Sequence, residues 1–164
     1  MIHHLIEQAI CGSIEELMIS DEQVAHVSST HTLNHSLLVL SQVKYSSIPV
    51  LTPKSEIVGL ITMSNIINAV TTLTDIDLER LHDLKVCDIE LNDAPTITMD
   101  APFEYVLGLL TDYNYLCVIQ SEEDAIFKGI ITRRALLKRI THLIHNLETE
   151  TYAPLVKALC KELK

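Results

Sequence analysis

The sequence predicts an α/β protein in which one β-α-β-β-α unit occurs twice and the two copies pack with pseudo-twofold symmetry. Residues 24–70 align with residues 94–140 without a gap, and most aligned pairs share apolar character. The identical pairs are Leu37/Leu107, Leu40/Leu110, Tyr45/Tyr115, Gly59/Gly129, Ile61/Ile131 and Thr62/Thr132. In both copies, short β-branched runs alternate with apolar residues spaced three and four apart, as strands alternating with helices require. Each copy is small for an independent core, so we expect the two to bury apolar surface against each other.

The composition requires a buried core and excludes several classes of protein. Hydrophobic residues make up 48% of the chain and its mean hydropathy is +0.25, too apolar for a disordered protein. No apolar run reaches the ~18 residues of a membrane span. The first residues lack the basic start and apolar core of a signal peptide. The four cysteines have no paired spacing, and Cys117 stands in an apolar run where a buried thiol is expected. We therefore expect a soluble cytoplasmic protein with reduced thiols.

In the first copy, the elements follow from apolar spacing and capping residues. The strands are expected at 24–27, 47–51 and 57–61. A helix with apolar residues at helical spacing follows Thr32, which stands where an N-cap belongs. A second helix is expected directly after Thr62, again with a threonine as its cap.

The second copy repeats this order. The strands are expected at 96–99, 116–119 and 127–131. Asp100 stands where the first helix of this copy needs an N-cap, and Pro102 suits its first turn. The last helix is expected to begin after Thr132.

The repeats divide the chain into five segments. Residues 1–18 have a helical pattern, of which 1–14 are assigned to a separate N-terminal helix. The others are the first repeat at 15–72, an acidic linker at 73–83, the second repeat at 84–142 and a helical tail at 143–164 that Pro154 interrupts. The amphipathic tail can cap the fold or contact a partner, and packing on its own domain is favoured because an apolar stripe is usually core.

The charge is distributed unevenly. Twelve basic and 22 acidic residues give a net charge of −10, which argues against a general nucleic-acid-binding protein. Residues 128–139 nevertheless carry five of the basic residues and no acidic one. Such a segment indicates either an anion site or a solvated helix face, and charge alone does not decide between them.

Two runs in each copy resemble a known family. YSSIPVL at 45–51 with GLITMSNII at 59–67, and YLCVI at 115–119 with GIITRRALL at 129–137, resemble paired CBS motifs. The resemblance to a CBS pair, or Bateman module, covers about residues 15–142. It implies tandem CBS repeats, adenine nucleotides bound in clefts between the repeats, and a homodimer.

Further residues resemble a narrower group, the stand-alone CBS-pair proteins of the CbpB/DarB type that bind cyclic di-AMP. These residues are VAHV at 24–27, LLVL at 37–40 and GIITRR at 129–134. The resemblance implies a non-enzymatic sensor of a bacterial second messenger, with no other cofactor and no nucleic-acid or membrane partner. It also implies that ligand occupancy regulates a target protein, including a (p)ppGpp synthetase. Gln23 departs from the lysine expected in the closest relatives.

Two positions leave alternatives open. In many CBS motifs, an aspartate three residues after a threonine holds both ribose hydroxyls of AMP or ATP, and here Asn65 and Ala135 occupy those positions. Asparagine can still donate and accept hydrogen bonds, which keeps an AMP- or ATP-binding energy sensor as one alternative. A protein-interaction module without a ligand is the other.

Arg133 and Arg134 are the strongest candidate ligand contacts. They follow the strand end at Thr132 in the first turn of a helix, where unpaired N–H groups favour phosphate and arginine adds a planar fork. Two basic residues there oppose the helix dipole unless an anion is bound. Tyr45 can stack on adenine or serve as repeat scaffolding. The candidate ligand-binding set is Gln23, Val24, Ala25, Val27, Tyr45, Ser46, Ser47, Ile48, Pro49, Thr132, Arg133 and Arg134.

Metal and catalytic chemistry are not indicated. His31 with His35 and His142 with His145 have helical spacing, but neither pair has a Glu or Cys at a ligand spacing. The sequence has no nucleophile elbow and no P-loop. We therefore expect neither a metal site nor an enzyme.

Overall fold

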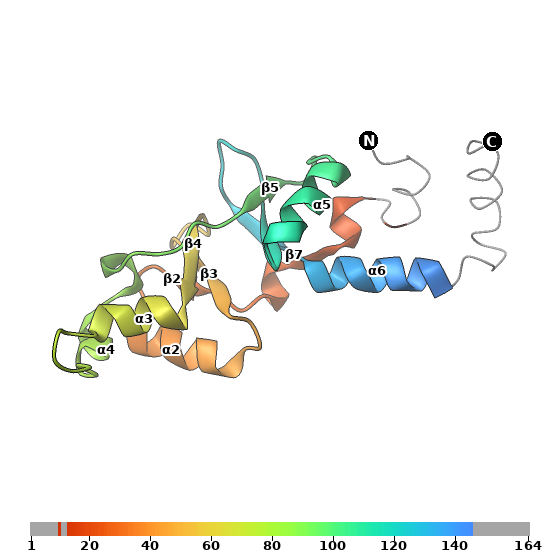
Figure 1. Ribbon diagram of the computed structural model, residues 1–164. Helices are drawn as coiled ribbons and strands as arrows, with labels where there is room; N and C mark the ends of the chain where they lie inside the picture. The colour runs from red at the N-terminus through yellow and green to blue at the C-terminus, as the bar shows by residue number, and fades with distance from the viewer. Residues whose placement is uncertain (1–9, 11–12, 146–164) are drawn as a thin grey trace, which may run out of the picture.

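Two sheets, each with its own helices, make up the fold of the computed structural model, which describes residue 10 and residues 13–145 (Figure 1). The first repeat contributes β2 (Val27–Ser28), α2 (Leu33–Gln42), β3 (Ser47–Leu51), β4 (Ile57–Thr62) and α3 (Met63–Val70). The second contributes β5 (Thr96–Thr98), α5 (Phe103–Asp112), β6 (Tyr115–Ile119), β7 (Phe127–Thr132) and α6 (Arg133–His145). The predicted doubled β-α-β-β-α order is confirmed.

The two sheets have the same internal topology. One has the order β2-β3-β4 and the other β1-β7-β6-β5. In each, the first strand of the repeat runs parallel to the second, which is antiparallel to the third. The additional strand β1 (Met18–Ser20) is the difference between them.

Each repeat completes the sheet edge of the other. β1 lies at the start of the first repeat but pairs with β7 of the second, where Ile19 lies opposite Ile130. In return, Asn92 near the start of the second repeat exchanges two backbone hydrogen bonds with Leu60 on β4, at 2.8 and 3.0 Å. Leu60 and Ile130 are equivalent positions of the two copies, so the exchange is reciprocal. Separating the repeats would therefore break sheet hydrogen bonds as well as apolar contacts.

This exchange explains why both copies carry a glycine at the same position. A Cβ on Gly129 would lie 2.1 Å from the carbonyl oxygen of Ile19, and a Cβ on Gly59 would lie 2.9 Å from that of Asn92. Gly129 also has a φ of 151°, which residues with a Cβ rarely adopt. The crossing segments can approach the sheets only because these positions lack side chains.

Among the residues that the structure describes, three apolar clusters form the core. One fills the first repeat and includes Val27 and Ile48, and a second fills the other repeat and takes in Ile14 and Leu17. The third joins the two sheets and consists of Leu51, Leu60, Tyr115, Cys117, Phe127 and Ile130. Cys117 is buried in this shared cluster, as expected, and burial raises the pKa of its thiol to about 12.

Equivalent residues meet each other between the repeats. Glu56 and Ile126 form an isolated bridge, and the ring centroids of Tyr45 and Tyr115 lie 6.3 Å apart. Since each pair joins the same position of the two copies, the pseudo-twofold axis passes between its members.

The helix caps follow the sequence with one exception. The hydroxyl of Thr32 accepts a hydrogen bond from the His35 amide, and that of Thr62 accepts one from the Asn65 amide. Asp100 as the cap of α5 is wrong, because the helix begins at Phe103 behind Pro102. The Asp100 carboxylate instead bonds to the Thr98 side chain, which lowers the pKa of the carboxyl group.

The strand expected at 24–27 is wrong in its bounds. Residues 21–23 form the short helix η2 (Asp21–Gln23). Of residues 24–27, only Val27 pairs with another strand, and β2 begins there. The chain here crosses from β1 in one sheet to β2 in the other, so the preceding residues have no strand to pair with.

The outer segments also differ from expectation. Residue 10 is helical as expected, but the helical pattern is wrong for residues 14–18, because η1 (Ile14–Glu16) is a 3-10 helix and β1 begins at Met18. The rest of the expected helix at 1–14, apart from residue 10, lies outside the described residues. The expected linker contains α4 (Arg80–Asp83), and η3 (Val86–Asp88) follows it. α6 continues to His145 in the expected tail at 143–164, whose remainder is not described. Across residues 10 and 13–145, every helix is too short or too polar to span a bilayer.

Candidate functional site

A cavity of about 960 Å³ opens between the two repeats, a size typical of small-molecule sites. We call it the inter-repeat cavity. Its walls come from the crossing segment after β1, the loop between α2 and β3, the loop between α5 and β6, and the first turns of α6. The lining residues are Gln23, Ala25, Val43, Lys44, Tyr45, Ser46, Asn114, Tyr115, Thr132, Arg133, Arg134, Leu137, Lys138 and Thr141.

The structure places the candidate residues in two groups. Those that line the inter-repeat cavity are Gln23, Ala25, Tyr45, Ser46, Thr132, Arg133 and Arg134. The side chains of Val27, Ile48 and Pro49 are buried, the first two in the core of the first repeat. Val24 packs against the cluster between the sheets, and the Ser47 hydroxyl bonds to that of Tyr115.

The start of α6 brings backbone and side-chain donors to the cavity. β7 ends at Thr132, whose hydroxyl accepts a hydrogen bond from the Ala135 amide at 3.0 Å and so caps the first turn. The Arg133 amide donates to the carbonyl of Asn114 at 2.9 Å, which ties the helix start to the loop before β6. The cap and this loop contact fix the direction in which the two arginines leave the helix.

The two arginines have different environments. Arg133 donates from Nε to the carbonyl of Leu110 and from its terminal nitrogen to those of Thr111 and Tyr113, at 2.7 to 3.1 Å. These carbonyls belong to the last turn of α5, where a cation complements the helix dipole. Arg134 is exposed at the cavity wall. Arg133 therefore fixes the wall of the cavity, whereas the Arg134 side chain is exposed at that wall.

Arg133→Ala is expected to lower the free energy of unfolding by about 1 to 3 kcal/mol, because it leaves the last turn of α5 without its charged donor. Arg133→Lys should recover only part of this, since an ammonium group cannot copy the planar fork. Urea unfolding followed by circular dichroism measures both. Arg134→Ala is the matched control and should stay within about 0.5 kcal/mol of wild type. Equal stability of Arg133→Ala and wild type would contradict the capping role.

Some residues that line the cavity were not among the candidates, including Lys44, Asn114, Lys138 and Thr141. Lys138 and Thr141 follow Arg134 by four and seven residues, so they share one face of α6. That spacing was visible in the basic segment and could have identified both. No local pattern marks Lys44 or Asn114, which lie in loops that only the tertiary fold brings to the cavity.

The cavity is basic within an acidic protein. Four of its lining residues are Lys or Arg and none is Asp or Glu, whereas the whole chain has a net charge of −10. In the alignment of the repeats, Met63 and Ser64 occupy the positions of Arg133 and Arg134. The two arginines therefore have no charged counterpart in the first repeat.

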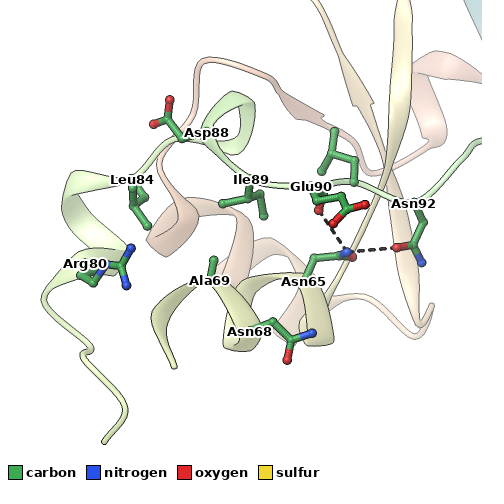
Figure 2. A pocket seen from close by; sticks show the side chains of 10 residues that line it. Asn65, Asn68, Ala69, Arg80, Leu84, Asp88, Ile89, Glu90 and Asn92 are labelled. Atoms are coloured by element: carbon green, nitrogen blue, oxygen red, sulfur yellow. Dashed lines mark hydrogen bonds between the residues drawn. The ribbon is translucent and has the colours of Figure 1, made fainter. Parts of the chain in front are cut away.

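A second cavity, of about 460 Å³, lies beside α3 (Figure 2). Asn65 lies at its edge, where Nδ2 donates to the Glu90 carbonyl at 3.2 Å and to Oδ1 of Asn92 at 3.0 Å. Its own Oδ1 accepts from the amide and the hydroxyl of Thr62. Both hydrogens and the oxygen of this amide are thus in use, and Asn65 fastens the segment before β5 to α3. A ribose contact from Asn65 would break this connection.

The part of the chain that the structure describes contains no group of three or more His, Cys, Asp or Glu side chains that could hold a metal ion. His31 and His35 approach each other with ring centroids 4.4 Å apart. Burial, followed by the charges of His35 and His26, lowers the pKa of His31.

Comparison with known proteins places the chain among nucleotide-binding relatives. The model of the CBS domain matches residues 14–72 and 86–142. Cyclic di-AMP receptor B of Bacillus subtilis is 33% identical over 147 residues, which cover 90% of this chain and 99% of the receptor. CbpB of Listeria monocytogenes in complex with c-di-AMP is 42% identical, with a TM-score of 0.71 over 80% of this chain and 97% of that one. CbpB from Streptococcus agalactiae is 29% identical, with a TM-score of 0.77 over 91% and 92% of the two chains.

Proposed function

Because this chain belongs to the family of CBS-domain proteins, we propose that it is a non-enzymatic receptor that binds cyclic di-AMP in the inter-repeat cavity. The observation that carries the proposal is the charge of this cavity, which has four basic lining residues and no acidic one. Cyclic di-AMP carries two phosphodiesters, and a local group of cations in an otherwise acidic protein suits a small dianion.

The residues of the cavity match the parts of the ligand. Arg134 and Lys138 lie one turn apart on α6, and their side chains can hold one phosphodiester between them. Lys44 comes from the first repeat and offers a cation for the other phosphodiester. Tyr45 has 48% of its surface exposed and offers a ring face to adenine, and Val43 and Leu137 add apolar surface.

The relatives support the same ligand. Cyclic di-AMP receptor B is similar over nearly its whole length, and CbpB of Listeria monocytogenes was solved with c-di-AMP. The ligand is a bacterial second messenger, so we expect the protein to act in the cytoplasm. Lys44 also lines the cavity and supplies a cation, which Gln23 does not.

We further propose that the protein is a homodimer and that occupancy of the cavity controls its binding to a target protein, including a (p)ppGpp synthetase. The cavity borders both repeats, and the repeats share their sheet edges, so a ligand in it contacts the parts of the fold whose relative position a partner would sense. Leu38 on α2, Tyr105 on α5 and Ile144 on α6 each expose more than half of their surface, which suits apolar contacts between subunits.

Isothermal titration calorimetry with cyclic di-AMP, cyclic di-GMP, AMP and ATP tests the proposed function. We expect cyclic di-AMP to bind at micromolar concentration or below, with one ligand per cavity and weaker binding at higher salt. Cyclic di-GMP controls for charge without adenine, and AMP and ATP control for adenine without the cyclic dianion. Preference for ATP would favour the energy-sensor alternative, although the hydrogen bonds of Asn65 account for that residue without a nucleotide. Binding of none of the four would favour a protein-interaction module without a ligand.

A further inference from the structure

The pseudo-twofold symmetry is broken at the tyrosine pair between the repeats. Tyr45 and Tyr115 are equivalent, and their rings contact each other edge-on, at 6.3 Å and 63°. Their environments nevertheless differ, because Tyr115 has only 6% of its surface exposed and Tyr45 has 48%. The next equivalent pair, Ser47 and Cys117, differs in chemistry, and this difference accounts for the asymmetry.

Ser47 anchors one member of the tyrosine pair. The oxygen of its hydroxyl lies 3.0 Å from that of Tyr115, and a buried tyrosine hydroxyl requires such a partner. At the equivalent position, Cys117 carries a thiol, which is a weak donor and acceptor and lies in the core between the sheets. Within residues 10 and 13–145, the structure records this tyrosine anchor on one side of the axis only.

We infer that Ser47 is a positioning residue of the inter-repeat cavity, which acts on the ligand through Tyr115 and Tyr45 rather than by touching it; this rests on the proposed function. The Ser47 hydroxyl holds the Tyr115 ring as a wall of the cavity, and Tyr45 packs edge-on against that wall. Tyr45 is thereby kept where its exposed face meets the ligand. Ser47 itself is engaged with Tyr115 and does not line the cavity.

The same asymmetry matches the distribution of charge. The cations line the same cavity as the exposed Tyr45, and the equivalents of Arg133 and Arg134 in the first repeat are Met63 and Ser64. Ser47 and the two arginines are therefore differences between the repeats that act at the same cavity.

A double-mutant cycle on cyclic di-AMP affinity tests this inference. Ser47→Ala and Tyr115→Phe each remove the same hydroxyl–hydroxyl bond, so each should weaken binding roughly three- to tenfold, and the double variant should lose no more than either alone. Ser47→Thr keeps the hydroxyl and should bind within about twofold of wild type. Cys117→Ala is the matched control, because it truncates the equivalent residue of the other repeat. It should lower the melting temperature but leave the affinity unchanged.

Each outcome separates the inference from the function on which it rests. If the wild-type protein does not bind cyclic di-AMP, the proposed function and the inference are both overturned. If the wild-type protein binds cyclic di-AMP and Ser47→Ala binds it with the same affinity, only the inference is overturned. A loss in Ser47→Ala but not in Tyr115→Phe also overturns it, because Ser47 would then contact the ligand directly. Equal losses of affinity in Ser47→Ala and Cys117→Ala would reduce Ser47 to a general packing role and overturn it as well.

Discussion

Gly129→Ala is expected to lower the free energy of unfolding by about 3 to 5 kcal/mol, the combined effect of steric overlap and backbone strain. The added Cβ would lie 2.1 Å from the Ile19 carbonyl oxygen, which is backbone and cannot rotate away. β1 would have to leave β7, and the second sheet would lose the edge strand that the start of the first repeat provides. A loss of this size is a large part of the stability of an ordinary domain.

Urea unfolding followed by circular dichroism measures this effect, and Gly108 provides the matched control. Gly108 lies in α5, where an added Cβ would meet no heavy atom within 4 Å, so Gly108→Ala should raise stability by up to about 1 kcal/mol. Gly59→Ala should fall between the two, since its nearest backbone atom is 2.9 Å away. If Gly129→Ala were as stable as wild type, the pairing of β1 with β7 would be contradicted.

The double variant Arg134→Ala/Lys138→Ala is expected to weaken cyclic di-AMP binding by at least about 100-fold. Each side chain offers a charge-assisted hydrogen bond of about 1.5 to 3 kcal/mol, and 1.4 kcal/mol corresponds to a tenfold change in affinity. Both line the inter-repeat cavity from one face of α6. The binding should also lose part of its dependence on salt, because two of the cations that face the ligand are gone. Titration calorimetry at two salt concentrations measures both effects.

Lys128→Ala/Arg139→Ala is the charge-matched control for this variant. It removes two positive charges from the same basic segment, but neither residue lines the cavity, and Arg139 bonds to Glu16 at 2.7 Å. Affinity within about threefold of wild type is expected, since only long-range charge is lost. If the control weakened binding as much as the α6 variant, the net charge of the segment and not its position would determine affinity.

The doubled unit was predictable because its signals are local. Strands, apolar helix faces and the threonine caps Thr32 and Thr62 depend on residues a few positions apart. β1 was not predictable in the same way. It is only three residues long, and its partner β7 lies more than a hundred residues away in the chain, so no neighbouring pattern distinguishes it from the helix expected there.

The candidate site likewise has features that the sequence predicts and features that depend on the folded structure. The sequence identified Arg133 and Arg134 as basic residues at a helix start, which is a local property. It did not indicate that Arg133 would cap α5, because the carbonyls of Leu110, Thr111 and Tyr113 meet it only after the sheet has formed. Ser47 was a candidate for direct ligand contact for the same reason, as its partner Tyr115 lies in the other repeat.

Sequence analysis alone predicts the repeated β-α-β-β-α unit, its threonine caps and the position of the basic segment. It does so because hydrophobic period, capping and charge depend on near neighbours in the chain. Three other features become visible only in the folded protein: the repeats exchange sheet edges at Gly59 and Gly129, Lys44 lines one cavity with Arg134 and Lys138, and Tyr45 is exposed while Tyr115 is buried. These features depend on which distant segments pack together, and no pattern of near neighbours in the chain records that.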